Sequence, residues 1–180
     1  MNPLPDNHPT DLADLAGLVQ QVAQALSQRG WMLATAESCT GGLIAATCTD
    51  LAGSSAWFDR GVVSYSNEAK TELLGVPAAL IDLHGAVSEP VALAMAEGIL
   101  RRSKAQIAVA VTGIAGPGGG SLEKPVGTVW LAWAWRNAVA ADGPMVCEAK
   151  CLSLAGDRSQ VRQGTVLEAL RQVLHLSVTG

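Results

Sequence analysis

The pattern of apolar and polar positions along the chain predicts alternating helices and strands. Apolar residues recur at helical spacing in five stretches, so helices are expected at residues 10–28, 43–51, 67–74, 88–103 and 157–175. Shorter apolar stretches predict strands at residues 31–36, 61–66, 105–111, 127–135 and 145–152. The expected fold is therefore α/β, a three-layer α/β/α sandwich around a mixed central sheet of about five strands.

Two of these strands carry information about their place in the sheet. Residues 105–111 read AQIAVAV, a continuous apolar run that is typical of a central strand covered on both faces. In residues 145–152, one face of the strand would carry Met145, Cys147, Ala149 and Cys151, and the other would carry Val146, Glu148 and Lys150. This alternation favours a strand nearer an edge of the sheet. Because no helix is expected between residues 127–135 and 145–152, these strands should form a hairpin, which makes the sheet mixed.

The expected elements form one domain, with neither an internal repeat nor a linker that would divide it. Residues 1–9 read MNPLPDNHP and show no periodicity, so we expect a loose tail there and a single domain over residues 10–180. Thr10 or Asp11 is expected to cap the first helix.

Composition and charge argue against several classes of protein. Of the 180 residues, 49% are hydrophobic and 16% are charged, so the chain can bury a sizeable core and should not be disordered. The net charge of −4 argues against a nucleic-acid partner, and no apolar stretch approaches the roughly 20 residues that span a membrane. The first residues do not read as a signal peptide. We therefore expect a cytoplasmic protein whose four cysteines are reduced thiols.

The first candidate for chemistry is the stretch at residues 35–42, between a strand and a helix. Ser38 lies there beside free backbone N–H groups of a helix N-terminus, where negative charge is favoured. Ser38 could be a nucleophile in this turn, or the turn could hold an anion. Alternatively, Ser38 and Thr40 only cap the helix. Cys39 competes as nucleophile, although a cysteine in such a turn is more often a buried small residue.

The second candidate is the stretch at residues 65–70. A strand ending at Tyr65 and a helix that Asn67 can cap would place Lys70 in the first helical turn, facing the same pocket as Tyr65. The helix N-terminus and partial burial both disfavour an ammonium ion, so the pKa of Lys70 should be lowered and its amine could act as a general base. The alternative is a solvated lysine paired with Glu68 or Glu72.

The third candidate is the glycine-rich loop at residues 112–121, directly after the expected central strand. Ligands of open α/β sheets bind in such loops, and the backbone amides could bind phosphate. The alternative is a flexible connection between strands. Arg158, at the start of the last helix, could bind a phosphate or carboxylate or could be solvated. No metal site is expected, because His84 lacks a partner at ligand spacing and Cys147 and Cys151 are four residues apart on one strand.

Six stretches together resemble the CinA C-terminal family. They read TAESCTGG (35–42), AGSSAWFDRGVVSYSNEAK (52–70), HGAVSEPV (84–91), TGIAGPGGG (112–120), KPVGTVW (124–130) and GDRSQVR (156–162). The resemblance extends from about residue 12 to residue 175 and implies a five-stranded mixed sheet between helices. It also implies the stand-alone form of the family, whose best-known activity is deamidation of nicotinamide mononucleotide. The chain departs from the family pattern in CLSLA before GDR, where Phe is common, and in GPGGG.

The resemblance implies site residues as well. By this resemblance, Ser38 is the nucleophile, and Tyr65 and Lys70 are the pair that assists it. Thr112 and Arg158 are further site residues. The implied reaction requires neither a metal ion nor a cofactor. The remaining motif residues that we expect to contact substrate are Glu37, Cys39, Thr40, Gly41, Gly42, Asn67, Gly113 and Gly116.

The implied reaction converts nicotinamide mononucleotide to nicotinate mononucleotide and ammonia, in the recycling of pyridine nucleotides. Lys70 would take the Ser38 proton directly or through Tyr65, backbone N–H groups of residues 39–42 would stabilise the oxyanion, and either the loop at 113–120 or Arg158 would bind the phosphate. Two other functions stay open, a non-catalytic nucleotide-binding or regulatory module and an interaction partner. The high apolar fraction favours a homo-oligomer, either a dimer or a tetramer.

Overall fold

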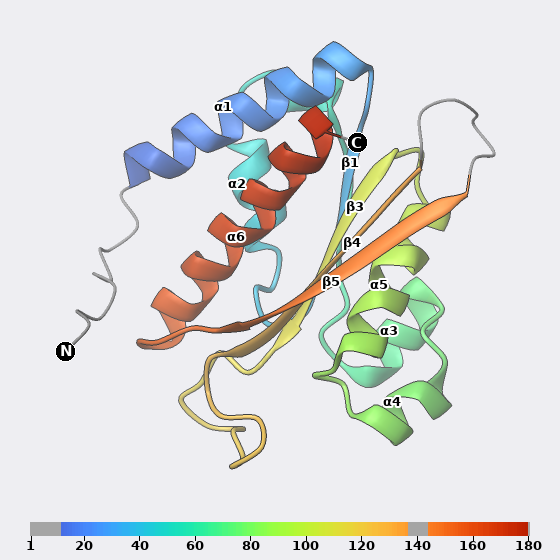
Figure 1. The fold of residues 1–180 in the computed structure, drawn as a ribbon, viewed down its shortest axis with the longest axis vertical. Coiled ribbons are helices and arrows are strands. Elements are labelled where there is room, and N and C mark those ends of the chain that lie inside the picture. Colours follow the sequence, from blue (N-terminus) through green and yellow to red (C-terminus); the bar gives the residue numbers. More distant parts are fainter. Residues whose placement is uncertain (1–11, 137–143, 180) are drawn as a thin grey trace.

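A computed structural model describes residues 12–136 and 144–179, and five of its elements are strands of one mixed sheet (Figure 1). The strands are β1 (Leu33–Glu37), β2 (Phe58–Val63), β3 (Ile107–Gly113), β4 (Thr128–Arg136) and β5 (Met145–Ser153), and their order in the sheet is β2-β1-β3-β4-β5. β1 is parallel to β2 and β3, whereas β4 is antiparallel to β3 and β5. The predicted hairpin, the mixed sheet and the edge position of β5 are all confirmed.

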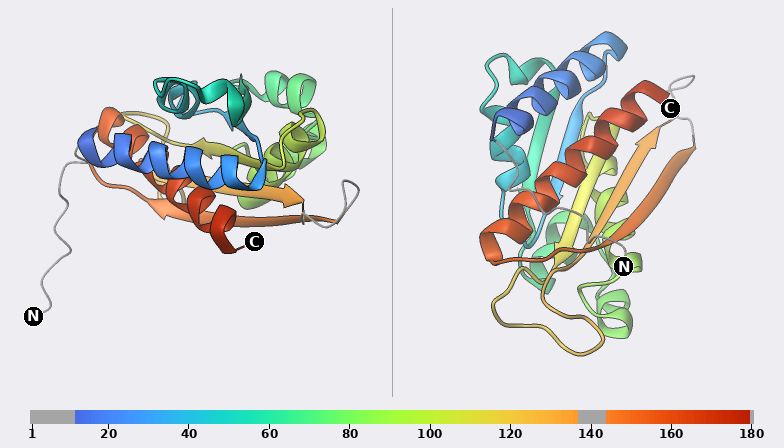
Figure 2. Two further views of the ribbon diagram at one scale, coloured as in Figure 1. Left: turned by 90° about the horizontal axis from the view of Figure 1, so that it is seen from above. Right: turned by 60° about the vertical axis from the view of Figure 1, so that its left-hand side comes forward.

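Helices cover both faces of this sheet. One face carries α1 (Leu12–Arg29), α2 (Leu43–Thr49) and α6 (Arg158–Thr179), and the other carries α3 (Asn67–Leu74), α4 (Ala78–His84) and α5 (Glu89–Arg101). A short 3-10 turn, η1 (Ser54–Ala56), precedes β2. α1 and α6 lie side by side across their face of the sheet (Figure 2). The three-layer α/β/α architecture is therefore confirmed.

Three details differ from the expected elements. The pattern did not predict α4, whose seven residues include one buried side chain, Ile81, and so show no helical repeat of apolar positions. β2 ends at Val63, earlier than expected, which places Tyr65 in the loop beyond the strand. Ser66, not Asn67, caps α3, because the Ser66 hydroxyl accepts a hydrogen bond from the backbone N–H of Ala69.

Some expectations concern residues that the structure does not describe. The tail at 1–9 and the cap at Thr10 or Asp11 lie outside the described residues, so the division into a tail and a single domain over residues 10–180 stays a prediction. Within residues 12–136 and 144–179, no helix is both long enough and apolar enough to cross a membrane. All four cysteines are free thiols, as expected.

The two faces of the sheet carry side chains of different size. In β3, Ile107, Val109 and Val111 belong to the core beneath α1 and α6, whereas the alanines between them belong to the core beneath α5. In β4, the buried Trp133 lies on the α6 side and donates its indole N–H to the carbonyl of Ala169. The first six residues of β3 are buried, as a continuous apolar run predicts for a central strand.

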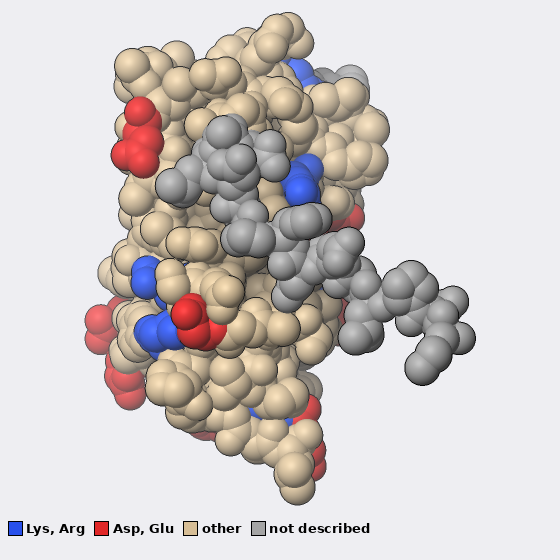
Figure 3. All heavy atoms as spheres, turned by 90° about the vertical axis from the view of Figure 1, so that its left-hand side faces the viewer, with Lys and Arg blue, Asp and Glu red and all other residues tan. Residues whose placement is uncertain are grey.

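Four strands of the sheet end on the same side, which we call the carboxyl edge of the sheet. β1, β2, β3 and β5 run in the same direction, so their carboxyl ends lie together. Ser38 follows β1, Tyr65 follows β2, the glycine-rich loop follows β3, and Arg158 begins the helix after β5. Open α/β sheets bind ligands at this edge. Figure 3 shows one side of the molecule, on which basic and acidic side chains are interspersed among uncharged ones.

Candidate active site

A cavity of about 280 Å³ opens at the carboxyl edge of the sheet. Nine of the thirteen predicted site residues line it: Ser38, Cys39, Tyr65, Asn67, Lys70, Thr112, Gly113, Gly116 and Arg158. The other four, Glu37, Thr40, Gly41 and Gly42, are not part of its wall. The cavity therefore brings together residues from all the motifs at this edge.

Lys70 and Ser38 meet in the wall of this cavity. The Lys70 Nζ lies 3.2 Å from the Ser38 Oγ. Although Lys70 is a charged residue type, only 1% of it is exposed. The same nitrogen lies 3.0 Å from the carbonyl oxygen of Ser64 and 3.2 Å from that of Tyr65. No described carboxylate forms an ion pair with Lys70, so this lysine is not a solvated side chain paired with a glutamate.

The surroundings of Lys70 favour the uncharged amine. Burial lowers its pKa below the ordinary value of 10.5, because a desolvated ammonium ion is disfavoured. A neutral amine has two N–H bonds and one lone pair. Three backbone carbonyls lie within hydrogen-bond distance of Nζ, and the two nearest, those of Ser64 and Tyr65, can accept hydrogen bonds from the two N–H groups. The lone pair is then left for the hydroxyl of Ser38. This arrangement suits a general base.

Glu37 holds the turn that carries Ser38. Its carboxylate accepts hydrogen bonds from the backbone N–H groups of Gly42, Ile44 and Ala45, over 3.0, 3.0 and 2.8 Å. Glu37 is fully buried and is not part of the cavity wall. Glu37 therefore satisfies the N-terminus of α2, which is not free to bind an anion, and its expected contact with the substrate stays a prediction.

Two backbone amides of the turn remain available. Gly41 N–H donates to the Ser38 carbonyl and Gly42 N–H donates to Glu37. The N–H groups of Cys39 and Thr40 have no acceptor among the described residues. The expected set of oxyanion donors at 39–42 is thus reduced to these two. Neither Ser38 nor Thr40 caps α2, whose N-cap is a glycine without a side-chain bond.

The surroundings of Cys39 disfavour it as a nucleophile. Burial raises the pKa of the Cys39 thiol to about 11. At neutral pH the sulfur is therefore protonated, and a thiol is a far weaker nucleophile than a thiolate. Cys39 lies at the cavity wall as a small buried residue, which was the alternative considered for it.

Arg158 joins the glycine-rich loop to the segment after β2. Its Nη1 donates to the carbonyl of Gly116 over 2.8 Å, and its Nη2 donates to the hydroxyl of Tyr65 over 3.3 Å. The two expected places for a phosphate, the loop and Arg158, are therefore parts of one region. The Tyr65 hydroxyl bonds to Arg158 and makes no hydrogen bond with Ser38 or Lys70, so the geometry favours direct proton transfer.

The glycine-rich loop offers unpaired backbone donors to the cavity. Four backbone N–H groups of the loop donate no hydrogen bond to any described residue, those of Ala115, Gly116, Gly118 and Gly119. All four residues line the cavity. Gly116 and Gly119 have positive φ angles of 84° and 87°, a left-handed conformation that glycine adopts without strain. The N-terminus of α6 is different, because Asp157 and Gln160 cap each other there.

Sequence reasoning missed the part of the wall that comes from the loop after α4. Ala86 and Val87 line the cavity, and the carbonyl of Ala86 accepts a hydrogen bond from the Thr112 hydroxyl over 2.8 Å. The signal was present, since both residues belong to the HGAVSEPV motif, but neither carries a functional group on its side chain. Within the described residues, no group of three or more His, Cys, Asp or Glu could hold a metal ion.

Known proteins share this sequence and fold. The chain is 52% identical over 159 residues to the nicotinamide-nucleotide amidohydrolase PncC of Escherichia coli K12, covering 88% of this chain and 92% of that protein. It is 53% identical over 172 residues to a CinA-like protein of Mycolicibacterium gilvum, of which it spans 39%. The crystal structure of the competence/damage inducible protein CihA from Agrobacterium tumefaciens matches with a TM-score of 0.83 and 44% identity, over 98% of this chain and 99% of that one.

The family assignment rests on nearly the whole chain. The model of the CinA C-terminal domain matches residues 15–177, a range that includes every residue of the cavity wall. The chain belongs to the CinA C-terminal domain family.

Proposed function

We propose that this chain is a nicotinamide-nucleotide amidohydrolase in which Ser38 is the nucleophile and the amine of Lys70 is the base. The observation that carries the proposal is the buried contact between Lys70 Nζ and Ser38 Oγ. The name of the Escherichia coli relative, which this chain matches over 92% of its length, supports the substrate. The chain spans about two fifths of its longer relatives, whose other regions take no part in the proposal.

The first step forms an ester between enzyme and substrate. The neutral amine of Lys70 removes the proton of the Ser38 hydroxyl, and the Ser38 oxygen attacks the carboxamide carbon. The carbonyl oxygen of the substrate becomes negatively charged in the tetrahedral intermediate. The N–H groups of Cys39 and Thr40 stabilise this charge, because they are fixed in the turn and have no other acceptor.

The second step releases ammonia, and the third releases the product. When the C–N bond breaks, the amino group leaves with the proton that Lys70 had taken. Lys70 is then neutral again and removes a proton from water, which attacks the ester. The Ser38 oxygen leaves and regains its proton from Lys70, so nicotinate mononucleotide departs from an unchanged enzyme. One base therefore serves both halves of the reaction.

The remaining groups of the wall position the substrate. The Thr112 hydroxyl donates to Ala86, so it can only accept a further bond, which suits the NH₂ group of a carboxamide. Tyr65, which is 60% exposed, offers an aromatic face to the pyridine ring. The free amides at residues 115–119 and the guanidinium of Arg158 bind the 5′-phosphate.

Ammonia release from nicotinamide mononucleotide tests the proposal, with wild type, Ser38→Ala and Ser27→Ala compared side by side. Ser27 is an exposed serine on α1 and serves as the matched control. We expect release by wild type and Ser27→Ala alone. Release by Ser38→Ala at the wild-type rate would remove Ser38 as nucleophile. If folded wild-type protein binds the mononucleotide but releases no ammonia, the chain is a non-catalytic nucleotide-binding module.

Light scattering, which measures the mass of the particle in solution, tests the expected homo-oligomer.

A further inference from the structure

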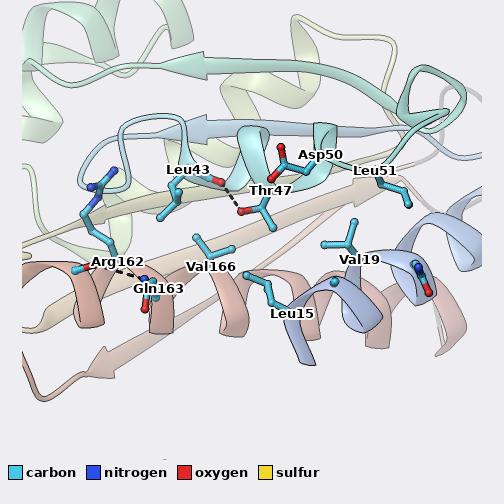
Figure 4. A pocket seen from close by; sticks show the side chains of 12 residues that line it. Leu15, Val19, Leu43, Thr47, Asp50, Leu51, Arg162, Gln163 and Val166 are labelled. Atoms are coloured by element: carbon cyan, nitrogen blue, oxygen red, sulfur yellow. Dashed lines mark hydrogen bonds between the residues drawn. The ribbon is translucent and has the colours of Figure 1, made fainter. Parts of the chain in front are cut away.

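A second cavity, of about 420 Å³, lies between α1, α2 and α6 (Figure 4). Its wall is mainly apolar: the side chains of Leu15 and Val19 from α1 and Val166 from α6 point toward Leu43 and Thr47 of α2 (Figure 4). A volume of this size lies in the range of small-molecule sites, which combine an apolar lining with a few polar groups. None of these residues has a part in the proposed amide hydrolysis.

One end of this groove carries a cation, the guanidinium of Arg162. Arg162 lines the cavity, and its Nη2 donates to the carbonyl of Thr40. Its Nε is buried and has no hydrogen-bond acceptor among the described residues. Among the carboxylates of residues 15–136 and 144–179, none forms an ion pair with this guanidinium. Because a partly buried charge without a partner is unfavourable, an anion at this end would be stabilised.

The other polar groups of the groove limit the charge of its occupant. Asp50 lines the cavity at the C-terminal end of α2, whereas Thr40 and the guanidinium bonded to it lie before the first residue of that helix. A second negative charge at the far end of the ligand would meet the Asp50 carboxylate. Ser159 and Gln163, beside Arg162 on α6, add neutral donors at the anion end.

We propose that this groove binds a small organic monoanion that has an apolar body and one carboxylate or sulfonate group. The anionic group lies on the Arg162 guanidinium, and the apolar body lies along α2, between Val19 and Val166. The bond to the Thr40 carbonyl holds the guanidinium in position before a ligand arrives, which lowers the entropy that binding costs. Neutral molecules of the same shape lack this contact and bind more weakly.

Two fluorescent probes with the same ring system separate the contributions of shape and charge. 8-Anilinonaphthalene-1-sulfonate carries one sulfonate, and N-phenyl-1-naphthylamine lacks it. With folded wild-type protein we expect saturable binding of one sulfonate probe per chain, about tenfold tighter than binding of the neutral probe. Octanoate should displace the sulfonate probe. Binding is measured without any enzyme substrate, so the result is independent of the amidase proposal.

Two substitutions on α1 and one on α6 locate the site. Ala16 is an exposed residue of the groove, and Ala16→Trp fills the groove and should weaken the sulfonate probe at least about tenfold. Gln21→Trp places the same ring at an exposed position outside the groove and should bind like wild type. Arg162→Met should bind both probes with similar affinity, because it retains an apolar side chain without the charge.

Thermal unfolding followed by circular dichroism confirms that each variant is folded before it is titrated. The proposal is overturned if wild type shows no saturable binding, or if Ala16→Trp binds the sulfonate probe as tightly as Gln21→Trp does. A folded Arg162→Met variant that keeps the wild-type preference for the sulfonate would also overturn it. Since Ala16 lies on the surface, the first comparison stands even if Arg162→Met does not fold.

Discussion

Two ionisable side chains, Glu37 and Lys70, are buried close to Ser38, the proposed nucleophile, and their surroundings give them different roles. Glu37 accepts hydrogen bonds from three backbone N–H groups and from the Thr35 hydroxyl. Lys70 contacts backbone carbonyls as well, but it also contacts the hydroxyl of Ser38 in the wall of a cavity. A buried charge is therefore not by itself a sign of chemistry.

The hydrogen-bond partners of Glu37 and of Lys70 distinguish a structural role from a chemical one. Every partner of Glu37 belongs to its own strand or to the start of α2, so removal of this carboxylate should mainly affect folding. One partner of Lys70 is a side chain with a proton to give, and a substrate can reach it. Removal of this amine should mainly affect the reaction. The following predictions test this division of roles.

Substitution of Lys70 should have the largest effect. We expect Lys70→Met to lower kcat by about a thousandfold, because the general base is lost, and to leave the melting temperature unchanged or higher, because a desolvated amine is removed. Lys70→Arg should be equally inactive, since a guanidinium does not lose its proton. Lys150→Met, at an exposed lysine, is the control for ammonia release. A folded Lys70→Met with more than a tenth of the wild-type rate would contradict the assignment.

Substitution of Glu37 should act on stability. In wild type, the Glu37 carboxylate accepts hydrogen bonds from backbone N–H groups. In Glu37→Gln, the amide NH₂ group would face these donors and could not accept from them, so the free energy of unfolding should fall by about 2–4 kcal/mol. Urea denaturation measures this change, and Glu72→Gln, at an exposed glutamate of α3, should leave the free energy of unfolding unchanged. The account fails here if Glu37→Gln is as stable as wild type. It also fails if the variant is destabilised but remains folded in the assay and is as inactive as Lys70→Met.

The rate should depend on pH through Lys70. The reaction needs the neutral amine, so kcat/KM should rise about tenfold per pH unit below the pKa of Lys70 and level off above it. Because burial lowers that pKa, the plateau should begin below the ordinary value of 10.5. A series of initial rates across pH, each checked for retained fold, measures the profile. A rate that falls as the pH increases through this range would contradict a lysine base.

Removal of the Tyr65 hydroxyl should have the smallest effect. Tyr65→Phe breaks the bond to Arg158 but keeps the carbonyl that holds Lys70. We expect KM to rise about threefold, because the bond to the guanidinium is long and lies at an exposed site, and kcat to change less than about twofold. Steady-state kinetics separates the two constants. If kcat instead falls as far as in Lys70→Met, the proton passes through the Tyr65 hydroxyl.

Much of this arrangement could be predicted from local patterns. The apolar run at residues 105–111 identified the central strand, because a strand covered on both faces has no polar side. Ser38, Tyr65 and Thr112 could be grouped because each lies at the end of a strand, and the ends of co-directional strands meet. Arg158 was added to this group by the resemblance to the family.

What could not be predicted depends on contacts between distant segments. Nothing local shows that the Glu37 side chain turns back to the amides of α2 rather than toward a substrate. The contribution of Ala86 and Val87 was missed because backbone and small side chains form that wall. The apolar groove beneath α2 needs α1 and α6, which are far apart in the sequence, to lie next to each other.

Titration of Lys70 by nuclear magnetic resonance tests the central claim most directly. Protein labelled with ¹³C at the lysine ε-carbon should show one resonance that is absent from Lys70→Met, which assigns it. We predict that this resonance titrates at a pH clearly below 10.5, because the buried ammonium is destabilised. If the resonance titrates at or above 10.5, Lys70 is an ordinary charged lysine, and its role as the base that activates Ser38 is contradicted.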